Sequence, residues 1–140
     1  MSSREWIWGL LAGLLTALLW ILSIPPFDFA EAAYIAFLPL LLWFFRRPNR
    51  RLAWVFSFTA CFIAWLCILI WLRHVSLLGT LLLALILAAI HLPWFVLAWW
   101  IQPKLPGRSF PLRVFGCAVL ACGWVVLEWV RSWFLWGFPW

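Results

Sequence analysis

Charged side chains are scarce in this sequence, and their scarcity argues against a soluble globular fold. Only 10% of the 140 residues are charged, whereas 69% are hydrophobic. Soluble domains have about 25% charged and about 45–50% apolar residues. A globule of this length would expose much of its surface to water, and the chain has too few polar side chains to cover that surface. We therefore predict that lipid is the solvent for most of the chain.

Acidic residues are rarer still: four stand against ten Lys and Arg, for a net charge of +6. Such a surplus in a soluble protein would suggest nucleic acid as a partner. Here the cations form short clusters between apolar runs, an arrangement that suits anionic lipid headgroups. We expect no nucleic-acid partner.

Metal and redox signatures are also missing. The histidines His74 and His91 are far apart in the sequence, without a cysteine or carboxylate at ligand spacing, so we expect no metal and no cofactor. His91 lies two residues before Pro93, and we interpret its imidazole as the partner of a carbonyl that the proline leaves unpaired. Four cysteines match no zinc or redox spacing, and we interpret them as small buried packing residues: Cys61, Cys67, Cys117 and Cys122.

Five apolar runs predict an all-α, polytopic membrane bundle of about five transmembrane helices. The first run, Trp6–Ile24, would reach about 28 Å as a helix, just enough to cross a hydrocarbon layer of about 30 Å. A cleavable signal peptide is the competing interpretation, but the weakly basic start and the poor cleavage site at Pro25-Pro26 favour a retained helix. The predicted spans, in one domain covering residues 1–140, are 6–24, 29–45, 52–72, 75–101 and 114–136.

The distribution of cations predicts the orientation of these spans. Eight of the ten Lys and Arg residues fall on one side of the predicted membrane, and only Arg73 and Arg131 fall on the other. Cytoplasmic loops carry the excess of positive charge. We therefore expect the N-terminus inside and the C-terminus outside, with the acids Asp28, Glu31 and Glu128 toward the outer side.

Glu128 is the most informative single residue. It lies about 24 Å along the last predicted helix, close to the outer interface. Arg131 follows three residues later on the same face, so an ion pair at the membrane boundary is available. A structural pair is one interpretation, and direct contact with a lipid headgroup is the other.

A stripe of tryptophans accompanies this pair: Trp129, Trp133, Trp136 and Trp140. The spacing of four, three and four residues places them on one helical face. Tryptophan prefers the headgroup level of a membrane. The stripe is interpreted as an aromatic belt, with a wall for an acyl chain or substrate as the alternative.

No residue of the chain is a candidate for catalysis. A nucleophilic serine or cysteine needs a neighbouring base and an orienting group. The only lysine, Lys104, is predicted on the side opposite the three outer acids, so no Glu-Lys-Cys constellation can form on one face.

Several segments together resemble one family, the apolipoprotein N-acyltransferases. The run from Glu128 to Trp133, followed by Gly-Phe-Pro-Trp at 137–140, resembles the family's E-(W/F)-x-R-x-W…G-F-P-W segment. Trp71 with Val75-Ser76 resembles a second segment of the family, and the Pro-Pro-Phe-Asp turn that ends at Asp28 resembles a third. The basic loop after the second span also falls where the family has one.

The resemblance implies the membrane-anchoring, lipid-facing part of an enzyme that moves an acyl chain from a phospholipid to the N-terminal cysteine of a diacylated lipoprotein. It places the chain in the bacterial inner membrane as a multi-pass protein, with phospholipid, lipoprotein and a separate or downstream nitrilase-like domain as partners. The family's catalytic Glu, Lys and Cys lie in that domain, which we expect to be absent from residues 1–140, as in a fragment or split product. Whether the chain itself is an enzyme stays open. The alternative is a small stand-alone membrane protein, either a transporter with Glu128 as its coupling acid or an assembly factor.

Overall fold

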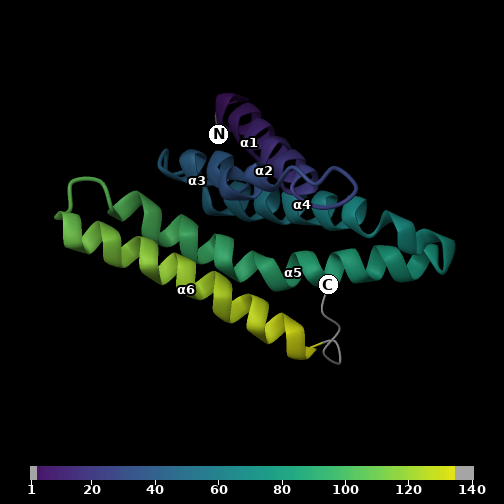
Figure 1. Ribbon diagram of the computed structural model, residues 1–140. Coiled ribbons are helices and arrows are strands. Elements are labelled where there is room, and N and C mark those ends of the chain that lie inside the picture. The colour runs from purple at the N-terminus through teal and green to yellow at the C-terminus, as the bar shows by residue number, and fades with distance from the viewer. Residues whose placement is uncertain (1–2, 135–140) are drawn as a thin grey trace.

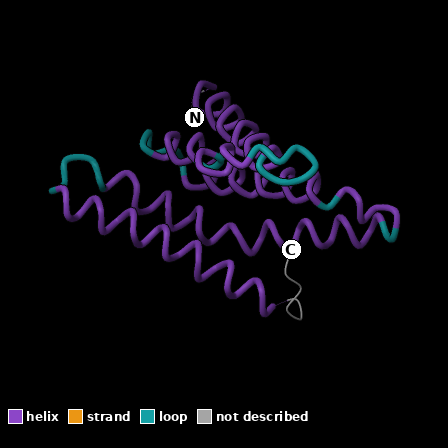
Figure 2. Tube along the Cα trace, viewed as in Figure 1, coloured by secondary structure: helices purple, strands orange, loops and turns teal. Residues whose placement is uncertain are grey.

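The structure is a computed structural model that describes residues 3–134, with the side chains of residues 4–133. All regular structure in that range is helical, as Figure 2 shows, so the predicted all-α bundle is confirmed. The elements are α1 (Ser3–Leu22), α2 (Ala30–Ile35), α3 (Leu38–Phe44), α4 (Arg50–Ile68), the 3-10 helix η1 (Ile70–His74), α5 (Leu77–Ile101), the 3-10 helix η2 (Gln102–Lys104) and α6 (Phe110–Phe134).

Four of the predicted spans are helices long and apolar enough to cross a membrane: α1, α4, α5 with η2, and α6. The second predicted span, 29–45, differs from the prediction. It consists of the two short helices α2 and α3, and the whole segment Ala30–Phe44 is shorter than the other four. Within the described residues the bundle therefore has four long helices and one short segment broken into two helices, which we call the broken pass.

Pro39 explains the break between α2 and α3. Its ring nitrogen carries no hydrogen, so it cannot donate to the carbonyl of Ile35 one turn earlier, and the ring crowds that carbonyl. The next amide, that of Leu40, donates instead to the hydroxyl of the fully buried Thr16 on α1, at 3.3 Å. The segment is thus hydrogen-bonded to α1 at the position where its own helical backbone hydrogen bonds are interrupted.

Successive passes run in alternating directions, which gathers three basic segments at one end of the bundle (Figure 1). The start of α1, the loop between α3 and α4, and the connection between α5 and α6 meet there. Arg46 lies 4.6 Å from the Trp8 ring centroid, Arg47 donates to the carbonyl of Pro103 at 3.1 Å, and Trp99 donates to the carbonyl of Pro48 at 3.1 Å. We call this the basic end.

Close packing of α1 on α4 depends on residues without bulky side chains. A Cβ atom at Gly9 would lie 2.5 Å from the ring of Phe56, and one at Gly13 would lie 3.3 Å from the Phe56 carbonyl. Small residues let membrane helices approach closely in this way. The expectation that all four cysteines are buried is wrong: Cys61 is buried, but the helix surfaces expose the other three, at positions 67, 117 and 122.

Candidate functional site: a histidine, a glutamate and an arginine between α5 and α6

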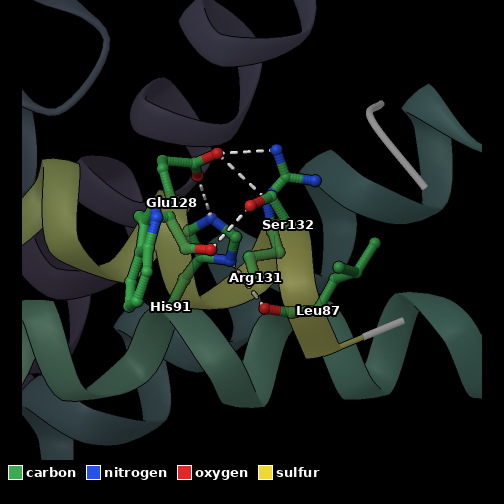
Figure 3. Close-up of polar contacts among 6 residues, drawn as sticks. Leu87, His91, Glu128, Arg131 and Ser132 are labelled. Atoms are coloured by element: carbon green, nitrogen blue, oxygen red, sulfur yellow. Dashed lines mark hydrogen bonds and ion pairs between the residues drawn. The ribbon is translucent and has the colours of Figure 1, made fainter. Parts of the chain in front are cut away.

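Three polar side chains meet between α5 and α6, in the half of α6 farther from the basic end (Figure 3). His91 Nε2 lies 3.0 Å from Glu128 Oε1. Arg131 donates twice to Glu128 Oε2, from Nε at 2.9 Å and from Nη2 at 2.6 Å. The His91 side chain is fully buried and that of Arg131 is 10% exposed, whereas Glu128 is 31% exposed. The carboxylate is therefore the part of the cluster that surrounding molecules can reach.

Hydrogen-bond chemistry fixes the number of protons in this cluster. His91 Nδ1 lies 2.7 Å from the carbonyl of Leu87, and because a carbonyl can only accept, Nδ1 must donate. The Nε2–Oε1 contact then holds a single proton, either on a charged imidazole facing a carboxylate or on a neutral carboxyl facing a neutral imidazole. In both forms the histidine and the glutamate sum to zero, so the cluster has a net charge of +1 from Arg131.

Aromatic rings from several helices surround the cluster. The rings of Trp20, Trp65 and Trp124 lie with their centroids 5.3–5.5 Å from that of His91. The guanidinium of Arg131 lies 5.7 Å from the Trp65 ring centroid, and its third nitrogen, Nη1, is buried without a hydrogen-bond partner among the described residues. Such apolar surroundings strengthen the hydrogen bonds that form and raise the cost of losing one.

A second polar contact fastens α6 to α5. Trp94 Nε1 donates to the carbonyl of Leu120 at 2.8 Å. Helix α6 has little other cover, because 11% of its most apolar stretch is buried, against 44% for α4. These two contacts therefore have a large share in positioning α6.

A comparison with protein-family models identifies the chain. The model of the apolipoprotein N-acyltransferase N-terminal domain matches residues 16–140. The chain belongs to this family. Comparisons with curated proteins and with solved structures give no significant match. Together with its long apolar helices, membership of this membrane-enzyme family makes the chain a multi-pass membrane protein.

The ion pair expected from the three-residue spacing of Glu128 and Arg131 on one helix is present. The two tryptophans of the family segment that contains this pair, Trp129 and Trp133, lie on the outside of α6. They are 63% and 72% exposed, with ring centroids 5.9 Å apart. Their contact with lipid stays a prediction. The remaining members of the stripe, Trp136 and Trp140, lie outside the described residues.

The other two family segments lie at the end of the bundle opposite the basic end. Asp28 is exposed in the turn after α1, with a φ of 57°, and its side chain makes no hydrogen bond or ion pair with the described residues. Trp71 is 54% exposed in η1. Whether either contacts lipid stays a prediction.

The pairing of His91 with Glu128 was not predicted from the sequence. The interpretation that His91 satisfies a carbonyl freed by Pro93 is wrong, because that carbonyl belongs to Ala89, whereas Nδ1 bonds to the carbonyl of Leu87. At the basic end α5 ends at Ile101, ten residues after His91, and α6 begins at Phe110, eighteen residues before Glu128. If the two helix ends lay at equal depth, Glu128 would lie eight residues, or about 12 Å, deeper than His91. The offset disappears in the structure because α6 begins beyond the end of α5 (Figure 1). The sequence did contain one indication of this pairing, because one histidine and one acid lie inside two consecutive predicted spans.

Proposed function

We propose that this chain forms the membrane part of an apolipoprotein N-acyltransferase of the bacterial inner membrane. The reaction forms an amide bond between an acyl carbonyl carbon and the α-amino group of a lipoprotein's N-terminal cysteine. It breaks an ester bond of the phospholipid donor, whose freed alcohol takes up a proton. The family match over residues 16–140 is the observation that carries this proposal.

The side chains described here support an anchoring and positioning role, with the reacting groups supplied by a nitrilase-like domain. Nucleophilic catalysis needs a nucleophile within hydrogen-bond reach of a base. Within residues 4–133 no cysteine or serine side chain bonds to a carboxylate, a lysine or a histidine; Ser132, beside the cluster, donates to the Trp129 carbonyl instead. Both nitrogens of His91 are already engaged, which leaves no free base in the cluster.

The site would contribute by fixing α6 and its outward-facing tryptophans at the level of the phospholipid headgroups. The partly exposed Glu128 lies beside them, on the same turn of helix as Trp129. On this proposal the cluster positions the membrane surface on which the lipid donor and the lipidated substrate meet.

Depletion of the gene in its own host tests the function. We expect lipoproteins with two acyl chains and a free α-amino group to accumulate, as measured by mass spectrometry of their N-terminal peptides. The wild-type gene should restore the third acyl chain. The Glu128→Ala gene should restore it poorly, and the Glu31→Ala gene, which removes an exposed acid outside the cluster, should restore it fully. Lipoproteins that stay fully acylated after depletion would overturn the proposal and favour a stand-alone membrane protein.

A further inference from the structure

Two adjoining cavities occupy the corner at the basic end where α5, η2 and α6 meet. The larger has a volume of about 460 Å³ and the smaller about 180 Å³. Trp100 and Lys104 line both of them, so the two cavities are direct neighbours. We call them together the corner groove.

The lining of the corner groove separates into a cationic rim and an apolar bed. The rim consists of Arg47, Lys104 and Arg108, and no acidic side chain lines either cavity. The bed is formed by apolar side chains of α5, the following turn and α6: Ile101, Leu105, Leu112, Phe115 and Val119. A ligand that fills this groove must therefore combine negative charge with a hydrocarbon part.

Contacts with neighbouring groups position two of the three rim cations. Lys104 Nζ lies 3.1 Å from the ring centroid of Trp100, and Arg47 is fastened to the carbonyl of Pro103. Arg108 follows in the turn before α6, and its side chain makes no hydrogen bond or ion pair with the described residues. All three lie where helices end, which is the level of lipid headgroups.

The apolar bed leads away from this rim along α6. Leu112, Phe115 and Val119 follow one another at spacings of three and four, so they lie on one face. From the first to the last they cover about 10 Å of helix, at 1.5 Å per residue. This direction matches a lipid whose headgroup is at the rim and whose acyl chain extends toward the membrane centre.

We propose that the corner groove binds an anionic glycerophospholipid, with its phosphate among the three cations and one acyl chain on the apolar bed. Basic pockets between transmembrane helices bind anionic headgroups by this combination of contacts. Arginine also presents several donors to phosphate oxygens in a fixed geometry. A lipid whose headgroup carries its own positive amine would match this rim less well.

A second groove at the same end, formed by two further adjoining cavities, differs from the corner groove in the charges of its rim. It lies between α1 and α3, and its apolar part is lined by residues such as Leu11 and Leu42. Its rim contains Arg4 and Arg46 but also Glu5. The acid offsets one cation there, whereas the corner groove has no such offset. We therefore assign the preference for anionic lipid to the corner groove.

The assignment does not depend on acyl transfer, so binding can be measured separately from activity. The full chain, purified in a non-ionic detergent, is titrated in a native mass spectrometer with phosphatidylglycerol, with phosphatidylcholine of the same acyl chains, and with inorganic phosphate. Each cation near an anionic lipid contributes about fivefold in affinity. We expect phosphatidylglycerol to bind at least about tenfold more tightly than phosphatidylcholine, and inorganic phosphate to leave it bound.

Two variants and one control locate the site. The triple substitution Arg47→Gln, Lys104→Gln, Arg108→Gln should remove the preference, and Val119→Trp should weaken lipid binding by filling the bed while leaving every charge in place. The matched control, Arg4→Gln, Arg50→Gln, Arg51→Gln, removes the same charge from the same end and should keep the preference. Thermal unfolding verifies that each variant is folded. If the triple variant does not fold, the lipid affinity of Val119→Trp decides whether the groove is the binding site.

Three results would overturn the assignment. Equal binding of the two lipids would remove the role of charge, and equal loss in the groove and control variants would reduce it to diffuse surface charge. Displacement of the lipid by inorganic phosphate would show that the apolar bed contributes nothing.

Discussion

Removal of the Glu128 carboxylate should destabilise the bundle strongly, because this one side chain takes part in three hydrogen bonds with two neighbours. In Glu128→Ala the fully buried His91 and the nine-tenths buried Arg131 lose these bonds together. Hydrogen bonds between membrane helices contribute about 0.6–1.7 kcal/mol each. Removing one partner of a buried pair also leaves the other without compensation. We expect a loss of about 2–4 kcal/mol, discounted toward the lower value because Glu128 is partly exposed.

The interaction across α5 and α6 is isolated by a double-mutant cycle. His91→Phe keeps an aromatic ring among the tryptophans but removes the bond to Glu128, and it should cost about 1–2 kcal/mol. The double variant His91→Phe, Glu128→Ala should lose about 1–2 kcal/mol less than the two single losses together. A parallel cycle with Arg131→Ala should show the same sign, because either single substitution removes both hydrogen bonds between Arg131 and Glu128.

Reversible unfolding in mixed micelles with increasing dodecyl sulfate, followed by far-ultraviolet circular dichroism, measures these changes. Glu31→Ala, at an exposed acid in the first turn of α2, is the control and should change stability by less than about 1 kcal/mol. Strict additivity of the His91 and Glu128 losses would refute the reasoning. Glu128 would then be better explained as a contact for lipid or for the catalytic domain.

Three further predictions concern the broken pass, the topology and the activity. Thr16→Val should cost about 1–2 kcal/mol because the amide of Leu40 loses its acceptor, whereas Thr16→Ser should be milder; unfolding in mixed micelles compares them. A periplasmic reporter fused after Trp140 should be active, and activity of a cytoplasmic reporter alone would contradict the orientation expected from the cations. Purified residues 1–140 in phospholipid should leave a diacylated lipopeptide unchanged in mass, and transfer that survives replacement of all four cysteines by alanine would contradict the family inference.

Much of the fold follows from the sequence because length and hydropathy alone define a membrane span. Each of the four long helices corresponds to one of the predicted apolar spans. The broken pass was not predicted, since Pro39 lies inside an apolar run that otherwise reads as one helix. Its capture by Thr16 depends on two segments 24 residues apart. The residue pattern within either segment does not predict a contact between positions so far apart in the sequence.

The same limit applies to the candidate site. The Glu128–Arg131 pair was predictable because both residues lie on one helix, where a spacing of three fixes their relative position. The bond from His91 was not, because it depends on how far α6 is displaced along α5. Residue counting assumes helices that start at equal depth, and α6 starts beyond the end of α5. The sequence therefore identified the acid and one partner, and the partner on the other helix required the structure.

The two polar contacts on α6 have a consequence for the face that this helix turns outward. In lipid, apolar surface gains little by choosing one neighbour over another, so burial alone does not select the rotation of a helix. Trp94 bonds α6 at Leu120 and His91 bonds it at Glu128, eight residues and about 12 Å apart. Two hydrogen bonds at this separation hold α6 against both rotation about its own axis and translation along α5. The direction in which α6 presents Trp129 and Trp133 is thereby set by hydrogen bonds on the side of the helix that packs against α5.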